Sequence, residues 1–478
     1  MHTIMWMIAI ILGYFAVLFA ISRLTARRAT NETFFRGNRQ SPWYMVAFGM
    51  VGASISGVTF VSVPGMVTGI DMTYMQTCLG FILGYIAVAF ILLPLYYRLN
   101  LTTIYSYLGQ RMGVRAYKTG ASFFLLSKMI GAVVRFYVVC MILQQFVFDA
   151  MGVPFAVTVS CMVALIWLYT RGGGIKTLVW TDTFQTICLF TALLLIIYKV
   201  VGQLGMTIPE AVSAIAADEH SRMFVMDDWV SKQNFWKQFL SGVFIVIVMT
   251  GLDQDMMQKN LTCKSLKEAQ KDMCTYGVAF VPANLLFLSL GVLLMMLGES
   301  GVSDTLLPGF VERSGLSVLI PFTIGIVAAS FSSADSALTS LTTSYCVDIR
   351  GMAGDEQLRK RAHLMISILF VVMILLFRLL NSTSVIDAIY TICGYTYGPL
   401  LGLFAFGMMT HRTPRDHYVP YICIASPLVC YAIDAITWRV ASYRFGYELL
   451  MMNGALTFLA LLAVSSPRTP SAECQTAS

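Results

Sequence analysis

The apolar residues of this chain fall in long runs, and the polar residues gather in shorter stretches between them. A helix needs about 20 apolar residues to cross the hydrocarbon core of a bilayer, and most of these runs are long enough. The pattern therefore predicts an all-α polytopic membrane protein with thirteen transmembrane helices, at approximately 2–24, 43–69, 73–99, 117–149, 153–170, 175–201, 234–252, 272–298, 315–347, 361–380, 384–410, 417–438 and 444–465.

The composition agrees with a membrane protein and argues against several other classes. Of the 478 residues, 57% are hydrophobic and 12% are charged, which is about half the charged fraction of a soluble domain. The cysteines form no CxxC pair, and the five histidines lie in predicted loops or at the ends of predicted spans. We therefore expect no zinc or redox motif, no histidine proton relay and no enzyme.

Charge placement predicts the orientation, because cytoplasmic loops of membrane proteins are enriched in Lys and Arg. Basic residues cluster in alternate predicted loops, for example Arg27, Arg28, Lys259 and Lys264, whereas the loop at 202–233 is rich in acidic residues. We predict a multi-pass protein of the plasma (cell inner) membrane with its N-terminus outside and its C-terminus in the cytoplasm. The net charge of +7 is then cytoplasmic loop charge, and no nucleic-acid partner is expected.

The chain is expected to form one transmembrane domain at 1–465 and a disordered cytoplasmic tail at 466–478. The spans at 43–69 and 234–252 both have polar, interruptible centres, GASISGVTFVSVPG and SGVFIVIVMTGLDQ, and each opens a set of five spans. Paired broken helices in two halves indicate an inverted-repeat transporter with a site near the membrane midplane. The alternative is that glycine and proline are simply common in membrane helices.

The stretch GASISGVTFVSVPG, residues 52–65, is the first candidate site. Its glycines and proline weaken a helix and would free backbone carbonyls, and Ser54, Ser56 and Thr59 add hydroxyls. Hard cations take oxygen ligands of this kind. Close packing through small residues explains the glycines, but it does not explain a proline together with three hydroxyls.

Ionisable residues inside predicted spans are the next candidates, because each costs at least about 2.5 kcal/mol there and needs a partner. Arg135 lies deep in the span at 117–149, where it would either pair with Asp182 or Asp335 or hold an anionic substrate. Asp182 lies two turns into its span, too deep for a helix cap, and suits an ion ligand or a proton site. Lys128 is expected to reach the cytoplasmic interface.

The stretch FSSADSALTS, residues 331–340, places a polar stripe on a membrane helix. Residues three and four apart share a helix face, so Ser332, Asp335, Ser336 and Thr339 lie together, with Ser333 beside them. Hydroxyls with one carboxylate suit a sodium ion. The alternative is helix–helix hydrogen bonding by Ser and Thr, worth about 0.6 kcal/mol per bond, which does not account for Asp335.

Four stretches occur in an order and spacing that resemble the sodium:solute symporter family, which includes sodium–glucose, sodium–proline, iodide and bacterial sialic acid transporters. They are GGGIKTLVWTDTFQ at 172–185, LDQDMMQKNLTCKSLKEAQ at 252–270, FSSADSALTSLTTSYCVDI at 331–349 and IDAIYTICGYTYGPLLGLFAFGMM at 386–409. The resemblance implies a five-plus-five inverted-repeat core, formed by spans two to eleven, with broken first and sixth core helices. The repeats would cover about 43–201 and 234–410, flanked by helices at 2–24, 417–438 and 444–465.

The resemblance also implies one or two bound Na⁺ ions. For the first sodium it implies as ligands the carbonyls of Gly52, Ile55 and Ala329 and the hydroxyls of Ser332 and Ser333. Some members bind a second sodium, at positions that match Asp182, Ser332, Asp335 and Ser336. The carboxylate of Asp335 departs from the hydroxyl usual in the family, which leaves Na⁺, H⁺ or a salt bridge from Arg135 open there.

For the substrate, the motif likeness is greatest to the bacterial sialic acid members. In those members two hydroxyls and an arginine hold the substrate carboxylate, and the matching residues here are Ser56, Thr59 and Arg135. A glutamine that also contacts this carboxylate is matched by Cys78. Positions that touch sugar in sugar-transporting members are matched by Asp253 and Tyr390.

These features together predict a sodium-coupled secondary active symporter that imports a small organic solute by alternating access. The solute would be an acidic sugar such as sialic acid, a sugar or a carboxylate. The alternatives are a proton-coupled carrier that uses Asp182 and Asp335, or a membrane solute sensor that does not transport. The expected partners are the small-molecule substrate and the lipid bilayer, with no obligatory protein partner.

Overall fold

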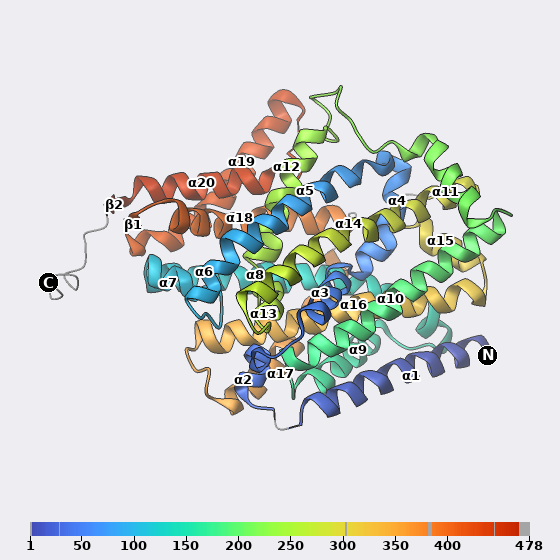
Figure 1. Cartoon of the computed structure of the whole chain (residues 1–478), viewed down its shortest axis with the longest axis horizontal. Helices are drawn as coiled ribbons and strands as arrows, with labels where there is room; N and C mark the ends of the chain where they lie inside the picture. Colours follow the sequence, from blue (N-terminus) through green and yellow to red (C-terminus); the bar gives the residue numbers. More distant parts are fainter. Residues whose placement is uncertain (1, 28, 302–303, 381–384, 444, 468–478) are drawn as a thin grey trace.

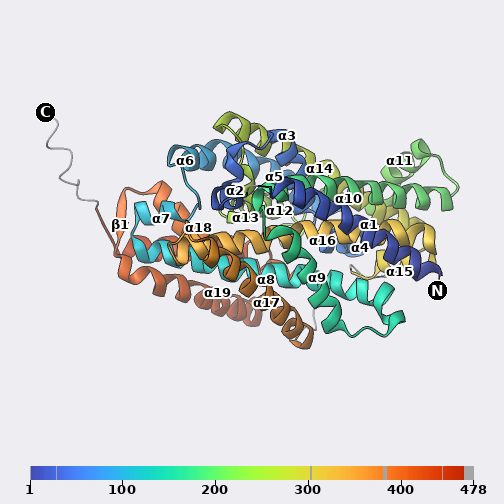
Figure 2. The same cartoon turned by 90° about the horizontal axis from the view of Figure 1, so that it is seen from below.

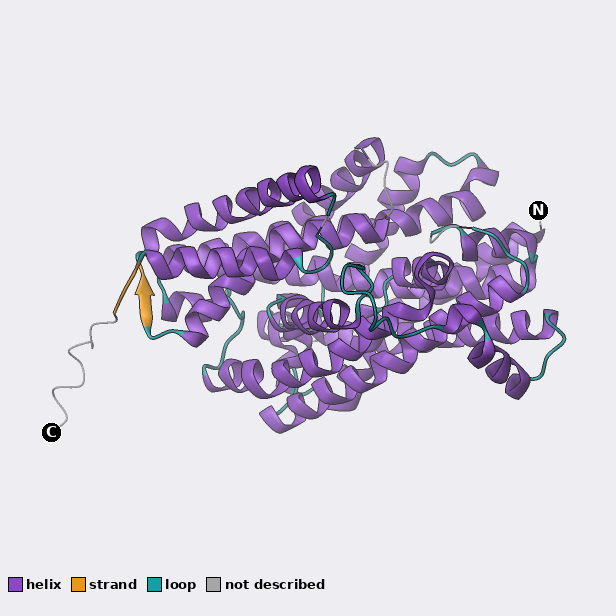
Figure 3. Cartoon of the chain, turned by 90° about the horizontal axis from the view of Figure 1, so that it is seen from above, coloured by secondary structure: helices purple, strands orange, loops and turns teal. Residues whose placement is uncertain are grey.

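The structure is a bundle of helices that run side by side. The computed structural model describes residues 2–27, 29–301, 304–380, 385–443 and 445–467, with the side chains of residues 2–6 and 380–393 outside the described part. Figure 3 shows helix throughout, apart from connecting loops and a short strand pair. The start of α1 (His2–Thr25) and the strand pair lie at opposite ends of the bundle in Figures 1 and 2.

A helix or a set of consecutive helices occupies each range in which the hydrophobic pattern predicts a span. These are α1, α3 with α4 (Trp43–Ser54 and Gly57–Ile70), α5 with η3 and α6 (Tyr74–Ala87, Val88–Leu92 and Leu93–Arg98), α8 with η4 and η5 (Val114–Leu143, Gln144–Phe148 and Asp149–Met151), α9 (Phe155–Thr170), α10 (Ile175–Gln203), α12 with η7 (Phe235–Val246 and Ile247–Gly251), α14 (Leu266–Met296), α16 with η8 (Leu316–Ser344 and Tyr345–Ile349), α17 (Glu356–Leu380), α18 (Val385–Met409), η9 with α19 (Asp416–Tyr418 and Val419–Ala441) and α20 (Leu449–Ala463).

Shorter elements lie in the connections. They are α2 (Asn31–Arg36), η1 (Gly37–Arg39), η2 (Asp71–Thr73), α7 (Ser106–Arg111), α11 (Ile208–Ala217), η6 (Glu219–Ser221), α13 (Gln254–Asn260), α15 (Leu306–Arg313), β1 (Arg412–Pro414) and β2 (Ser465–Pro467). The two strands pair antiparallel, so the first residues of the predicted tail at 466–478 belong to a sheet. Residues 468–478 lie outside the described residues.

The described helices support a multi-pass membrane protein. By length and apolar composition, 8 of them could cross a membrane, or 9 if the bent pair α12–α13 forms one span, and this count takes Gly57–Arg98 as a single helix. The number of crossings is therefore less than thirteen on this criterion, and thirteen stays a prediction.

The helix interruption predicted in GASISGVTFVSVPG lies between α3 and α4. Ile55 has φ −80° and ψ 88°, and Ser56 is extended with φ −75° and ψ 169°. The Ser56 hydroxyl then caps α4 by accepting a hydrogen bond from the Thr59 amide at 3.5 Å. Serine is a favoured residue at this position because its side chain replaces a missing helical acceptor. The predicted interruption is confirmed.

The second predicted interruption separates α12 from α13. The end of α12 passes into a π-helical turn, and α13 then leaves at an angle of 69° to it. The Asp253 carboxyl caps α13 by accepting from the Asp255 amide at 2.8 Å. The carbonyls of Gly251 and Leu252, at the break itself, accept from the hydroxyls of Tyr96 at 2.8 Å and Tyr105 at 2.9 Å.

Three basic or titratable residues that were expected in a loop, at the interface or at the end of a span are buried in the structure. Lys259 was expected in a cytoplasmic loop, yet it is 1% exposed because α13 turns back into the protein. Lys128 was expected to reach the interface, and it is also buried. His363 was expected at the end of a span, but its ring is buried between the hydroxyls of Thr170 and Thr342, at 2.9 Å from each. Hydropathy along the chain does not indicate how a side chain turns toward partners on other helices.

Helix α5 crosses α12 through two glycines that face each other. A Cβ atom on Gly80 would collide with the Phe239 carbonyl oxygen, and one on Gly242 would collide with the Thr77 carbonyl oxygen. Small residues let membrane helices approach closely, so that their backbones pack directly. This contact holds α12, and with it the second interruption, against α5.

We predict that Gly242→Ala lowers the melting temperature of the detergent-purified protein. The added methyl group meets backbone atoms that cannot rotate away, and overpacking of this kind costs about 1–3 kcal/mol. Gly202→Ala in α10 is the matched control, because no heavy atom lies within 4 Å of its added Cβ. Alanine is the better helix former, so the control should melt at the same temperature or higher. Equal melting temperatures for the two variants would contradict close backbone packing at Gly242.

Candidate functional site

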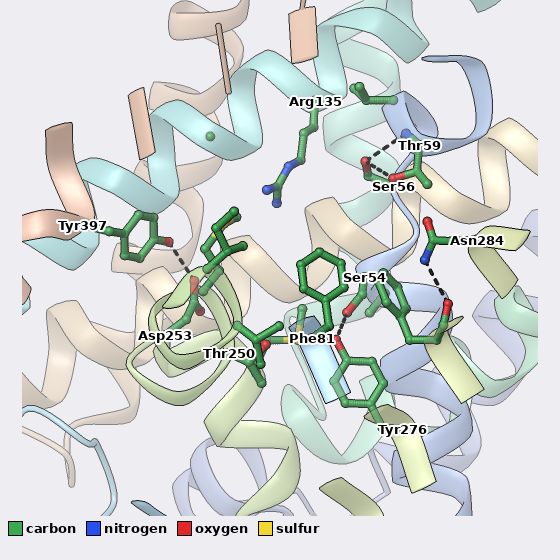
Figure 4. A pocket seen from close by; sticks show the side chains of 18 of the residues that line it. Ser54, Ser56, Thr59, Phe81, Arg135, Thr250, Asp253, Tyr276, Asn284 and Tyr397 are labelled. Carbon is green, nitrogen blue, oxygen red and sulfur yellow. Dashed lines mark hydrogen bonds between the residues drawn. The ribbon is translucent and has the colours of Figure 1, made fainter. Parts of the chain in front are cut away.

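A partly open cavity of about 130 Å³ lies where the two interrupted helices meet α5, α8, α14 and α18. Figure 4 shows its lining at close range. The wall combines aromatic rings with a few polar groups, among them Tyr74, Phe81, Tyr85, Tyr276, Phe280, Ser56, Thr59, Arg135, Asp253 and Asn284. A mostly apolar cavity with a small number of placed polar groups is typical of a small-molecule site.

Arg135 points from α8 into this cavity in Figure 4, and Ser56 and Thr59 line the cavity as well. Its guanidinium forms no ion pair or hydrogen bond with any residue that the structure describes. Neither of the expected pairings is present, because Asp182 pairs with Lys259 and Asp335 accepts from Tyr169. The guanidinium is therefore available to a ligand, and its planar donors suit a carboxylate.

Asp253 lies at the opposite side of the cavity in a buried network of charges. The Lys128 ammonium is 3.2 Å from the Asp253 carboxyl and 2.6 Å from the Asp255 carboxyl. The Tyr397 hydroxyl donates to Asp253 at 2.7 Å. Sequence reasoning did not identify Lys128, Asp255 or Tyr397 as members of this site. A lysine within an apolar span was the available signal, since such a residue needs a buried partner.

The residues expected to hold the first sodium meet where α3 ends beside α16. The Ser333 hydroxyl of α16 donates to the carbonyls of Ala53 at 2.9 Å and Ala329 at 3.2 Å. The Ser56 amide donates to Ser54, and so it leaves the Gly52 carbonyl without its helical partner. The Thr59 amide donates to the Ser56 hydroxyl, so the Ile55 carbonyl likewise loses its helical partner. Free carbonyls beside a serine hydroxyl fit the oxygen ligands of a hard cation.

Helix α10 closes this region from the other side. Gly52 packs directly against α10, since a Cβ atom there would collide with the Thr186 side chain. The Ser332 hydroxyl donates to the Asp182 carboxyl at 2.7 Å. The structure thus brings Ser333 to α3 and Ser332 to α10, although the two residues are adjacent in sequence.

The residues expected to hold a second sodium lie beside other partners in the structure. The buried ammonium of Lys259 lies 2.8 Å from the Asp182 carboxyl, where the cation was expected. The two oxygens of the Asp335 carboxyl accept from Tyr169 at 2.6 Å and Ser336 at 3.3 Å. Sequence reasoning missed Tyr169, and it assigned Lys259 to a loop.

Two further expected substrate contacts are not among the residues that line the cavity. Cys78 is fully buried in α5, between the cavity-lining Tyr74 and Phe81, but it does not line the cavity itself. The side chain of Tyr390 lies outside the described residues.

Comparison with known proteins places the chain in a family. The sodium/sialic acid symporter SiaT of Proteus mirabilis (strain HI4320) is 26% identical, with 87% of each chain covered. The sodium-coupled monocarboxylate transporter 2 of Mus musculus is 25% identical, covering 82% of this chain and 65% of that protein.

Solved structures show the same fold. A Na⁺-coupled sialic acid symporter in a substrate-bound, outward-open state aligns with a TM-score of 0.80 at 20% identity, covering 96% of this chain and 97% of the other. Mhp1, a nucleobase-cation-symport-1 family transporter, aligns in a closed conformation with a TM-score of 0.60 at 15% identity, covering 90% and 93% of the two chains. The model of the sodium:solute symporter family matches residues 34–416, and this chain therefore belongs to that family.

Proposed function

We propose that this protein imports a small organic anion together with sodium by alternating access. The observation that carries the proposal is the junction of α3, α4 and α16. There the Ser333 hydroxyl donates to the Ala53 carbonyl, and the nearby carbonyls of Gly52 and Ile55 lack their helical amides. The adjoining cavity holds the unpaired Arg135. Membership in the sodium:solute symporter family supports the same conclusion.

In this proposal sodium is a co-substrate whose binding joins α3 to α16. Gly52, Ile55 and Ala329 offer carbonyl oxygens, and Ser333 offers a hydroxyl from the opposite helix. An ion held by both helices favours the state in which they lie together, and the adjoining cavity is then formed for the substrate. Coupling is the difference in affinity between the two states. A tenfold sodium gradient supplies about 1.4 kcal/mol per ion, enough for tenfold accumulation at one ion per substrate.

The substrate class follows from the charge and size of the cavity. Arg135 would hold a carboxylate by a bidentate contact, assisted by the hydroxyls of Ser56 and Thr59. The aromatic side chains opposite, such as Phe81 and Tyr276, suit an apolar body. A cavity of about 130 Å³ is similar to the roughly 150 Å³ cavity that binds benzene. A small carboxylate fits it as it stands, whereas an acidic sugar needs it to widen.

The topology within the membrane is part of the proposal. Thirteen spans, with repeats at about 43–201 and 234–410, agree with the helices at all the predicted ranges and with interruptions that open both halves. We propose one domain at 1–465, with the N-terminus outside and the C-terminus in the cytoplasm. The start of α1 and the strand pair lie at opposite ends of the bundle in Figures 1 and 2, which supports an odd number of crossings.

Uptake into sealed vesicles tests sodium coupling and the role of Ser333. With the pH gradient collapsed, an inward sodium gradient should drive uptake of an organic acid that first raises the melting temperature of the purified protein. Ser333→Ala should raise the half-maximal sodium concentration about tenfold, if the loss of one ligand costs about 1.4 kcal/mol.

Thr323→Ala on the same helix is the control, because its hydroxyl donates to the Leu319 carbonyl one turn earlier. The control should leave the sodium dependence unchanged. Uptake that follows a proton gradient and ignores sodium would refute the proposal in favour of a proton-coupled carrier, and an unchanged sodium dependence in Ser333→Ala would remove Ser333 from the site.

Arg135→Lys tests recognition of the carboxylate. Lysine keeps the charge but loses the planar pair of donors, so the half-maximal concentration of the transported acid should rise at least tenfold. The amide of the same acid should compete equally well with both proteins. If the transported compounds prove to be neutral, or if the acid binds both proteins alike, Arg135 does not bind the substrate.

Side-specific labelling tests the orientation. Lys232 and Lys264 are both exposed, in loops that we propose lie outside and inside the cell respectively. A membrane-impermeant maleimide should label Lys232→Cys in intact cells, but Lys264→Cys only after permeabilisation, with the unmodified protein as the blank. The reverse pattern would invert the proposed topology.

A further inference from the structure

We propose that the side-chain oxygen of Asn284 accepts a hydrogen bond from the substrate, so that the transported acid carries a hydroxyl group as well as its carboxylate. The inference rests on the proposed function, in which Arg135 holds the carboxylate in the same cavity. It adds a second point of recognition on α14, a helix to which the sequence assigned no site residue.

The amide of Asn284 has a fixed orientation. Its nitrogen donates to the carbonyl of Phe280, one turn earlier in α14, at 2.9 Å, and Figure 4 shows this bond. Because a carbonyl oxygen cannot donate, the amide nitrogen has to face Phe280, and the amide oxygen Oδ1 therefore points away from it. The side chain of Asn284 is fully buried.

This amide oxygen has no partner within the protein. Of the residues that line the cavity, Asn284 is the only one with a fully buried side-chain nitrogen or oxygen that lacks a hydrogen-bond partner among the described residues. A buried acceptor without a donor is costly, and such groups are rare in folded proteins. The bond to Phe280 explains one half of the amide and leaves the other half unexplained. A substrate that donates a hydrogen bond accounts for both halves.

Two contacts hold α14 in place on either side of Asn284. Two turns before it, the Tyr276 hydroxyl is hydrogen-bonded to the Ser54 hydroxyl of α3. Two turns after it, Gly291 packs against α4, because a Cβ atom there would collide with the Pro64 carbonyl oxygen. Spacings of seven and eight residues place all three α14 residues on one helix face. Asn284 therefore lies on the face of α14 that packs against the interrupted helix.

The chemistry of the cavity favours a hydroxyl as the donor. An amide oxygen carries no net charge, so it suits a neutral donor, whereas a buried ammonium needs a carboxylate. The acidic residue of the cavity wall is Asp253, and its carboxyl already has the Lys128 ammonium at 3.2 Å and the Tyr397 hydroxyl at 2.7 Å. The cavity therefore matches a hydroxycarboxylic acid better than an amino acid or a plain carboxylic acid.

Asn284 acts on specificity. Its oxygen is covered in this structure, so the substrate hydroxyl reaches it as the partly open cavity widens around the substrate. A site that hydrogen-bonds a substrate hydroxyl also rejects the analogue that lacks it, because the buried acceptor then stays unpaired. The hydroxy acid is selected over the plain acid for this reason, although both offer the same carboxylate to Arg135.

Matched acids test the inference on the purified full-length protein in detergent with sodium present. The probes are butyrate and its 2-, 3- and 4-hydroxy derivatives, in which the hydroxyl lies at three separations from the carboxylate. For each acid, the concentration that gives half of the maximal rise in melting temperature is measured. We expect one of the hydroxy acids to act at a concentration about tenfold or more below that of butyrate, because butyrate leaves the Asn284 oxygen without a donor.

Asn284→Leu has a similar shape and no acceptor. It should abolish this preference by weakening the hydroxy acid, while butyrate acts as before. Asn284→Ala tests the same loss with a smaller side chain, in case the leucine variant does not fold. Ser127→Ala is the control in the same cavity and should keep the preference, because the Ser127 hydroxyl already donates to the Phe123 carbonyl at 2.7 Å.

Three results would overturn the inference. The preference could persist in a folded Asn284 variant, the three hydroxy acids could act no better than butyrate on the unmodified protein, or none of the four acids could stabilise it. The proposed function is tested separately, by sodium-driven uptake, and it survives each of these results. Uptake that ignores sodium contradicts the proposed function whatever the preference among the acids.

Discussion

A membrane helix that stops at mid-depth must find partners for the backbone groups that it no longer satisfies itself, because the bilayer offers no water. This chain meets the requirement in two different ways. At the second interruption, hydroxyls of Tyr96 and Tyr105 donate to the carbonyls of Gly251 and Leu252. At the first interruption, Ser333 donates to Ala53, while the carbonyls of Gly52 and Ile55 lose their helical amides. Side-chain hydroxyls thus cover the Gly251 and Leu252 carbonyls of the second break, whereas the proposed cation site uses carbonyls that no described side chain covers at the first break.

Charge is distributed in the opposite way. The first interruption carries hydroxyls and no ionisable side chain, whereas α13, after the second, carries Asp255 and Lys259 into the protein. Each of these finds an opposite charge, on Lys128 of α8 and Asp182 of α10 respectively. Removing one partner of such a pair leaves a buried charge and is strongly destabilising. These ion pairs hold α13 against α8 and α10. The second interruption is therefore stabilised by buried ion pairs, whereas the first interruption remains accessible to ligands.

The sequence was sufficient to predict features that depend on local pattern. Run length predicted where helices lie, and glycine, proline and hydroxyl content predicted both interruptions. The helical spacing of three and four residues also predicted that Ser332 and Asp335 face the same side of α16, and the family resemblance associated Ser332 with Asp182. What could not be predicted depends on direction after a bend. Lys259 reads as a loop residue until the 69° turn before α13 is known, and Tyr169 gives no local sign that it will meet Asp335.

The cavity and the proposed sodium site together determine the net charge that is transported in one cycle. Lys128 lies against Asp253 and Asp255, and Lys259 lies against Asp182, so these charges belong to the chain and are not transported. The guanidinium of Arg135 is partly exposed to the cavity and has no counterpart among the described residues, so it is available to an anion. One sodium ion and one monoanionic substrate add no net charge to the empty carrier. At a ratio of one sodium ion to one monoanionic substrate, the sodium concentration gradient drives accumulation and the membrane potential does not contribute, because the charge of the substrate cancels that of the ion.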